Sequence, residues 1–143
     1  MPSLTHFGLD GLAEAFANIY QIPENVQIAM LNAEAEVASR AMKTTGEAYG
    51  VRDDESTVHI LDVMVKSKPN KGSDGVYLYI TFKGTRTDEK HDHVRNAEIA
   101  FVNEYGRPGQ AARPFVRDSL EKAEGNIYAA AENVYNEWID KTF

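Results

Sequence analysis

The chain has 143 residues, no cysteine and a net charge of −7 at pH 7, and 43% of its residues are apolar. This length favours a single domain over residues 1–143, and the apolar share is enough for a core, which excludes a disordered chain. The lack of cysteine excludes a disulfide framework, a thiolate zinc site and a cysteine nucleophile, and the acidic balance argues against a general nucleic-acid binder.

The sequence holds no run of about 18 apolar residues, the length that a membrane-spanning helix needs. Its first residues do not combine a basic region with an apolar segment, as a signal peptide would. We therefore expect a soluble protein inside the cell.

Two helices are predicted at the start of the chain. The first covers residues 9–20, and its apolar residues recur at steps of three and four: Leu9, Leu12, Phe16 and Ile19. Pro23 then suits the first turn of a second helix over about residues 23–48. The stripe of this second helix is thin and rich in alanine: Val26, Met30, Ala33, Val37 and Ala41. Such a stripe fits a core helix, but it also fits a helix that packs on a partner chain.

The middle of the chain predicts two strands joined by a loop. Residues 58–65 are rich in β-branched side chains, which favour strands. Residues 76–83 alternate strictly between apolar and polar, the pattern of a half-buried strand, and place Tyr77 and Tyr79 on the solvent face. The prolines, glycines and polar residues of 66–75 indicate the loop between them.

A third strand is predicted over residues 96–105, after a charged loop at 84–93. From Pro114 the period becomes helical and continues to the C-terminus. The apolar stripe of this last helix is Val116, Leu120, Ala123, Ile127, Val134 and Trp138. The order is α-α-β-β-β-α, and we predict an α+β fold in which a small antiparallel sheet of three or four strands packs against the helices.

A tight connection links the third predicted strand to the last helix. Gly106, Pro108 and Gly109 interrupt regular structure, since glycine tolerates positive φ and proline lacks a backbone donor. Phosphate-binding loops lie at similar places, before a helix. However, the Lys-Ser/Thr pair of such loops is missing, and Pro108 and Pro114 remove two donors. We therefore favour a structural turn over a phosphate site.

Motifs for catalysis and metal binding are scarce. No nucleophile elbow, dinucleotide-binding sequence or Walker sequence occurs, so we expect neither an enzyme nor a bound cofactor. His91 and His93 form a His-x-His pair, and on a strand both imidazoles would face one metal ion, with a third ligand from elsewhere. The interpretation that we favour is a solvated loop that holds two histidines, with a small metal- or ligand-binding module as the distant alternative.

Four arginines lie close together in the sequence of this otherwise acidic chain: Arg95, Arg107, Arg113 and Arg117. Their planar guanidinium groups pair well with carboxylates, so they could form a docking patch for an acidic partner surface. They could equally pair within the chain, for example with Glu104 or Asp118. The sequence is compatible with both interpretations.

The segments Arg95–Gly106 and Gln110–Arg117 resemble the signature of the gene-product-ten-like tail-component family of tailed phages and prophages. In that family, a strand ending in a Val-x-Glu-(Phe/Tyr)-Gly sequence leads through a short loop into Pro-Ala-Arg-Pro-Phe-(Leu/Met)-Arg and a C-terminal helix. The residues of the structural motif are Glu104, Tyr105, Gly106, Pro114 and Phe115. This chain departs from the family at Ala111, where proline is usual, and at Val116, where leucine or methionine is usual.

The resemblance implies a structural virion protein that acts in tail completion or head–tail joining and has no catalytic activity. It implies a ring of identical subunits that contacts other head and tail proteins. DNA would pass through the lumen of the ring without sequence-specific binding, and no membrane is expected as a partner. The protein would be located in the virion, and in the host cytoplasm during assembly. A tail terminator, which caps the tube and fixes its length, is the alternative. The candidate interface residues are Arg107, Arg113, Arg117, Tyr77 and Tyr79.

Overall fold

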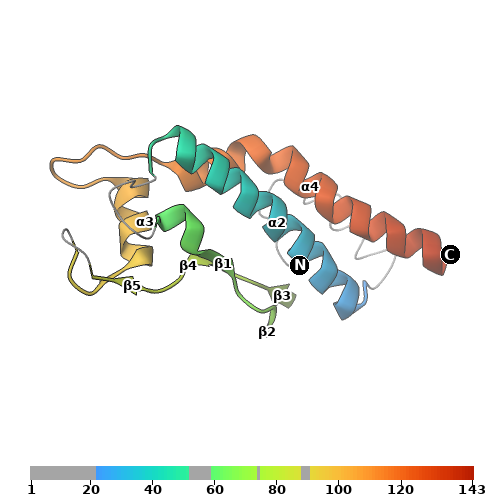
Figure 1. Ribbon diagram of the computed structural model, residues 1–143. Coiled ribbons are helices and arrows are strands. Elements are labelled where there is room, and N and C mark those ends of the chain that lie inside the picture. The colour runs from blue at the N-terminus through green and yellow to red at the C-terminus, as the bar shows by residue number, and fades with distance from the viewer. Residues whose placement is uncertain (1–21, 52–58, 74, 88–90) are drawn as a thin grey trace. The chain divides into compact units, whose positions relative to one another are not determined.

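A computed structural model of the chain describes residues 22–51, 59–73, 75–87 and 91–143 (Figure 1). The helices are α2 (Glu24–Ala48), the 3-10 helix η2 (Ile60–Val63), α3 (Asn96–Tyr105) and α4 (Phe115–Thr142). The strands are β1 (Met64–Lys66), β2 (Asn70–Gly72), β3 (Gly75–Tyr77), β4 (Ile80–Phe82), β5 (Thr85–Arg86) and β6 (Val94–Arg95). The predicted α+β class is confirmed, with a helix first, short antiparallel strand pairs next and helices last.

Some of the predicted strands are wrong. Residues 96–105, predicted as the third strand, form the helix α3. The strands pair two by two, β1 with β4, β2 with β3 and β5 with β6, so no sheet of three or four strands forms in the described part of the chain. Half of the first predicted strand, 58–65, is the 3-10 helix η2, only its last two residues enter β1, and residue 58 lies outside the described residues. The predicted helix over residues 9–20 lies outside the described residues.

The helix α3 forms because its inward side chains recur at the helical period. Asn96, Ala100 and Asn103 are buried, at steps of four and three. Both asparagines are hydrogen-bonded, as buried amides must be. The Asn96 amide donates to the Lys83 carbonyl oxygen at 2.8 Å, and the Asn103 amide donates to the Ile99 carbonyl oxygen at 3.0 Å. A strand would have turned Asn96 and Asn103 to opposite faces, so only one of them could have been buried in this way.

The two long helices agree with the sequence in their bounds, within about one residue. The buried face of α2 differs from the predicted stripe beyond Met30: its buried apolar residues there are Leu31, Ala35, Ala38 and Met42. Two of these four are alanines, which let a neighbouring element approach closely. This burial supports the core-helix interpretation of α2.

The chain divides into two compact units, and the expectation of one domain over residues 1–143 stays a prediction. The first unit takes its described residues from 22–37, 67–73, 75–79 and 124–143. The second takes them from 38–51, 59–66, 80–87 and 91–123. Each long helix therefore contributes one part to each unit.

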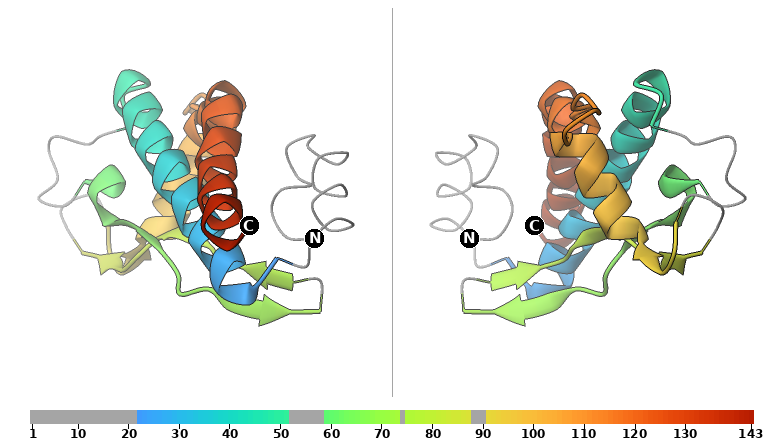
Figure 2. Two further views of the ribbon diagram at one scale, coloured as in Figure 1. Left: turned by 90° about the vertical axis from the view of Figure 1, so that its right-hand side faces the viewer. Right: turned by 90° about the vertical axis from the view of Figure 1, so that its left-hand side faces the viewer.

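In the first unit, the start of α2 packs on the second half of α4. Val26 and Met30 of α2 meet Ala131 and Tyr135 of α4 in one apolar cluster. The β2–β3 hairpin lies beside the first turn of α2 (Figure 2), where the Lys71 ammonium pairs with the Glu24 carboxylate at 3.0 Å.

Next to this hairpin, residues 67 and 79 are joined by one backbone hydrogen bond and one hydrogen bond to a side chain. The Ser67 N–H donates to the Tyr79 carbonyl oxygen at 2.7 Å, as in an ordinary ladder. In return, the Tyr79 N–H donates to the Ser67 hydroxyl at 2.8 Å, so the side chain takes the place of a backbone acceptor. The strand predicted over 76–83 is divided into β3 and β4, with residues 78 and 79 between them. On β3, Val76 is buried and Tyr77 is exposed, which is the predicted alternation.

In the second unit, the core gathers around the start of α4. Phe115 is fully buried, together with the other members of its cluster: Val51, Ile60, Leu61 and Ala100. Phe82 of β4 meets Phe115 edge-on, with ring centroids 6.0 Å apart. This cluster joins α4 to the 3-10 helix η2 and to α3.

The end of α2 depends on two glycines. A Cβ at Gly46 would lie 2.6 Å from a methyl group of Leu61, so a glycine lets η2 pack directly on the helix. Gly50, with φ of 72°, then ends α2 in a Schellman motif. The Val51 N–H donates to the Gly46 carbonyl oxygen at 2.9 Å and the Gly50 N–H donates to the Glu47 carbonyl oxygen at 3.2 Å.

Candidate functional site

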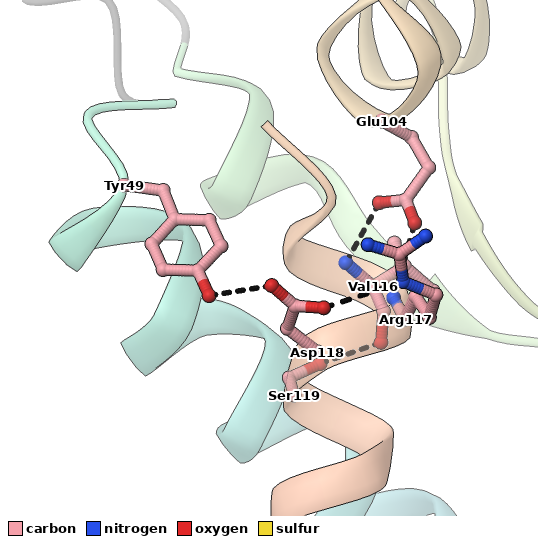
Figure 3. A network of polar contacts seen from close by, with 6 residues as sticks. All are labelled: Tyr49, Glu104, Val116, Arg117, Asp118 and Ser119. Atoms are coloured by element: carbon pink, nitrogen blue, oxygen red, sulfur yellow. Dashed lines mark hydrogen bonds and ion pairs between the residues drawn. The ribbon is translucent and has the colours of Figure 1, made fainter. Parts of the chain in front are cut away.

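The two halves of the tail-component-like signature meet at the start of α4. The Glu104 carboxylate, on α3, accepts the backbone N–H of Val116 at 2.8 Å and that of Arg117 at 3.1 Å (Figure 3). A carboxylate at this position also interacts favourably with the positive end of the helix dipole. Glu104 therefore caps α4 from outside the helix.

The other donors of this first turn are also accounted for. Pro114 has no N–H, and the Phe115 N–H donates to the Arg113 carbonyl oxygen at 2.7 Å. The Asp118 N–H makes the first regular helical bond, to the Pro114 carbonyl oxygen at 3.0 Å. A helix normally leaves its first N–H groups without a partner inside the helix, whereas those at the start of α4 are hydrogen-bonded to other groups of the chain. A phosphate would have to displace the Glu104 carboxylate to bind here, which argues further against the phosphate interpretation.

The connection from α3 to α4 contains a tight turn, as the glycines and prolines predicted. Arg107 and Gln110 exchange two backbone hydrogen bonds, at 3.0 and 2.9 Å, across Pro108 and Gly109. Gly109 has φ of 85° at the third position of this turn, which requires glycine or asparagine in a type II turn.

Gly106 is required by a close crossing of the backbone. It has φ of 77° at the end of α3, where its N–H donates to the Val102 carbonyl oxygen at 2.8 Å. A Cβ there would lie 2.8 Å from the Ala112 nitrogen and 2.9 Å from the Gln110 carbonyl oxygen. No other residue fits without moving the backbone.

A second polar network joins the end of α2 to α4. The Tyr49 hydroxyl donates to Asp118 Oδ2 at 2.6 Å, and Arg117 Nε lies 3.3 Å from Asp118 Oδ1 (Figure 3). The hydrogen bond from Tyr49, helped by Arg117 and by the charge of Lys122, lowers the pKa of Asp118. The same hydrogen bond, with partial desolvation, raises the pKa of Tyr49. Both groups are thus held in the protonation states that the bond needs, which is the behaviour of a structural contact.

The arginines do not act as one cluster. Arg95 pairs with Glu98 at 2.9 Å on the first turn of α3, and Arg117 pairs with Asp118. Arg113 donates from Nη1 to the Gly50 carbonyl oxygen at 2.8 Å and from its N–H to the Asn103 carbonyl oxygen at 2.6 Å. These contacts favour the intramolecular interpretation for three of the four. Arg107 is exposed, and its guanidinium has no partner among the described residues.

Arg107 is therefore the arginine that stays available for a partner. It sits on the tight turn, one residue after Gly106 ends α3, and its backbone N–H and carbonyl oxygen are both hydrogen-bonded to Gln110.

Tyr77 and Tyr79 face solvent, as predicted. Their side chains are 41% and 62% exposed, and the two rings meet edge to face with centroids 5.5 Å apart. They stay candidates for an interface.

The sequence interpretation missed a second exposed aromatic pair. Phe101 and Tyr105 lie one turn apart on the outer side of α3, 61% and 68% exposed, with ring centroids 4.6 Å apart. Their spacing of four residues was the available signal, but it is visible only once 96–105 is treated as a helix.

The histidine pair shows no metal-binding geometry in the described residues. His93 has φ of 53° and its ring lies beside its neighbour Asp92, at 3.5 Å, and beside the Thr87 hydroxyl, also at 3.5 Å. No group of three or more His, Asp or Glu side chains that could hold a metal ion is found in the described part of the chain. His91 and His93 therefore gain no support as ligands.

Comparison with known proteins does not assign the chain to a family. No family model matches the chain, and the searches of curated proteins and of solved structures found no match. Of the helices in the described ranges, none is both long enough and apolar enough to span a membrane.

Proposed function

We propose that this chain is a structural component of a phage or prophage tail, which acts in tail completion or head–tail joining by assembling into a ring. The proposal is carried by the tail-component-like signature, because its two halves depend on each other physically. Glu104 of the first half caps the helix that Pro114 and Phe115 of the second half begin. Gly106 permits the crossing that brings the halves together. Residues that interlock in this way are expected to recur as a set.

The surface supplies groups that suit assembly. Interfaces are enriched in tyrosine, phenylalanine and arginine, and such side chains are exposed here at Tyr77, Tyr79, Phe101, Tyr105 and Arg107. A ring requires two different patches on each subunit, which a chain with several separate exposed aromatic groups can provide. The net charge of −7 is compatible with a lumen through which DNA passes without sticking.

Assembly and genetics test the proposal together. Light scattering and electron microscopy of the purified protein, alone and with purified tails, are expected to reveal rings or bound tail ends. Deletion of the gene is expected to leave tails of normal length that fail to join heads. Overlong tails after deletion would favour the terminator role instead. A monomer that neither binds tails nor restores assembly in the deletion would contradict both roles.

A further inference from the structure

Charge is distributed very unevenly along this acidic chain. Residues 64–86, which hold the strands β1 to β5, carry five basic residues and one acidic residue, and two of the basic residues, Lys68 and Lys71, lie in the first unit. Residues 124–143, the second half of α4, carry four acidic residues and one basic residue. Two oppositely charged surfaces on one chain give a subunit the means to bind a copy of itself head to tail.

The basic surface of the first unit is the hairpin patch, which we define as Lys68, Tyr77 and Tyr79. All three are exposed, and no described side chain pairs with the Lys68 ammonium. The backbone beneath it is fixed, because the Lys68 carbonyl oxygen accepts the Ser67 hydroxyl at 3.0 Å and the Asn70 amide at 3.0 Å. The lysine is thus presented from an ordered position, which lowers the entropy lost on binding.

The edge of this hairpin is protected against pairing with another strand. Three residues, Ser67 to Pro69, lie between β1 and β2, whereas only Leu78 and Tyr79 lie between β3 and β4, so the longer side bulges. A bulge, a lysine and a proline on an edge all discourage strand addition. A partner therefore meets the side chains of the hairpin patch and not its backbone.

The acidic surface is the outer face of α4, which we define as Glu137 and Asp140. Both are exposed, and neither has an ion-pair partner in the described part of the chain. The opposite face of this half of α4 carries Ala131 and Tyr135, which pack on α2. The acidic face therefore points away from the core of the first unit and is open to a partner.

We propose that the hairpin patch of one subunit docks on the acidic outer face of α4 of the next copy, and that this contact joins neighbours in the ring. The inference rests on the proposed function and names the two patches that a ring needs. The ammonium of Lys68 pairs with the carboxylates, while Tyr77 and Tyr79 contribute apolar area and hydroxyl groups to the contact. Repetition of one contact between two different patches closes a ring when the rotation between neighbours returns to the first subunit.

Charge reversal tests this contact from both sides. Lys68→Glu and Glu137→Lys should each weaken self-association at least about tenfold in sedimentation velocity, because each places like charges opposite one another. Glu121→Lys is the matched control. It makes the same change in net charge as Glu137→Lys, at an exposed position of α4 in the other unit, and it should leave association within about twofold of the original chain.

The decisive measurement is whether combining the two substitutions restores self-association. The chain that carries both Lys68→Glu and Glu137→Lys has an interface with reversed but complementary charges, so it should associate again. A mixture of the two single variants should also assemble, since each supplies the patch that the other needs. Folding of every variant is checked by its melting temperature, which should stay unchanged at these exposed positions.

Failure of the inference differs from failure of the proposed function. If the original chain forms rings and the charge reversals leave them intact, the docking contact is wrong and the ring stands. If the original chain stays monomeric and does not bind tails, the proposal of a ring is wrong, and the proposed docking contact is wrong as well. Binding of a single-stranded oligonucleotide that Lys68→Glu abolishes, with self-association unchanged, would instead make the hairpin patch a nucleic-acid surface and overturn the inference.

Discussion

The carboxylate of Glu104 and the backbone N–H of Val116, twelve positions apart in the sequence, meet at 2.8 Å. Because the same carboxylate accepts the Arg117 N–H, Glu104→Ala leaves two donors of the first turn of α4 unpaired. Loss of a capping side chain costs about 0.5–2 kcal/mol, and the upper part of this range is expected because the acceptor is charged. Urea unfolding followed by circular dichroism measures the change in the free energy of unfolding.

Glu104→Gln is the matched control for this prediction. The amide keeps one oxygen acceptor of similar reach but carries no charge. It should lose roughly half as much stability as the alanine variant. Full retention of stability by Glu104→Ala would show that water replaces the cap without loss.

Glycine-to-alanine substitutions at two positions should have opposite effects. Gly106→Ala places a Cβ 2.8 Å from the Ala112 nitrogen and forces a positive φ on alanine. The backbone conformation alone should destabilise the protein by about 1–2 kcal/mol. Gly125→Ala lies in the middle of α4, where a Cβ meets nothing within 4 Å, and should stabilise the protein by up to about 1 kcal/mol. Thermal melting distinguishes them, and a raised melting temperature for Gly106→Ala would contradict the crossing at Ala112.

Stability should depend on pH through Tyr49 and Asp118. The pKa of Asp118 is lowered from its ordinary value of 3.8, so its contribution is present above that pH and is lost as the pH falls through the lowered value. The pKa of Tyr49 is raised from 10.0, so its contribution is present below that pH and is lost as the pH rises through the raised value. Tyr49→Phe should therefore lower the melting temperature by a constant amount between about pH 5 and 9, and by less outside that window.

Tyr105→Phe is the control for the pH prediction. Its hydroxyl is on an exposed side chain with no hydrogen-bonding partner among the described residues, so the variant should follow the original chain at every pH. A Tyr49→Phe profile that stays parallel to the original down to strongly acidic pH would mean that Asp118 does not contribute through this bond.

Three substitutions around the turn separate folding from docking. Phe115→Ala empties a fully buried site and should cost about 3–5 kcal/mol. Arg113→Ala removes a hydrogen bond to the Gly50 carbonyl oxygen and should cost about 0.5–1.5 kcal/mol. Arg107→Ala should change stability by less than about 0.5 kcal/mol but weaken binding to purified tails, measured by co-sedimentation. Equal loss of stability at Arg107 and Arg113 would remove Arg107 from the proposed interface.

The long helices could be predicted from sequence because local signals agree along their whole length. Pro23 and Pro114 fix where they begin, and Gly50 fixes where α2 ends. The stretch 96–105 could not, since its apolar residues fit both a period of two and a period of 3.6. The choice depends on partners for Asn96 and Asn103 that lie elsewhere in the chain, Lys83 and Arg113 among them.

The sequence could predict only those features of the candidate site that depend on the local backbone conformation. Gly106, Gly109 and Pro114 follow from backbone conformation, which short sequence patterns reveal. The bond between Tyr49 and Asp118 joins residues 69 positions apart, so no pattern in the sequence indicates it. The acceptor role of Glu104 was likewise hidden, because the segment that carries it was expected to be a strand.

The hydrogen bonds that Glu104 accepts also couple the local unfolding of α3 to that of the first turn of α4. The amides of Val116 and Arg117 are bonded to a side chain of α3 and to no carbonyl of α4, so their hydrogens exchange with solvent when α3 withdraws Glu104. These two amides would therefore report the opening of α3, a helix to which they do not belong. If they exchange at the rate of the α3 amides and faster than those of the next turn of α4, α3 and the first turn of α4 open as one cooperative unit.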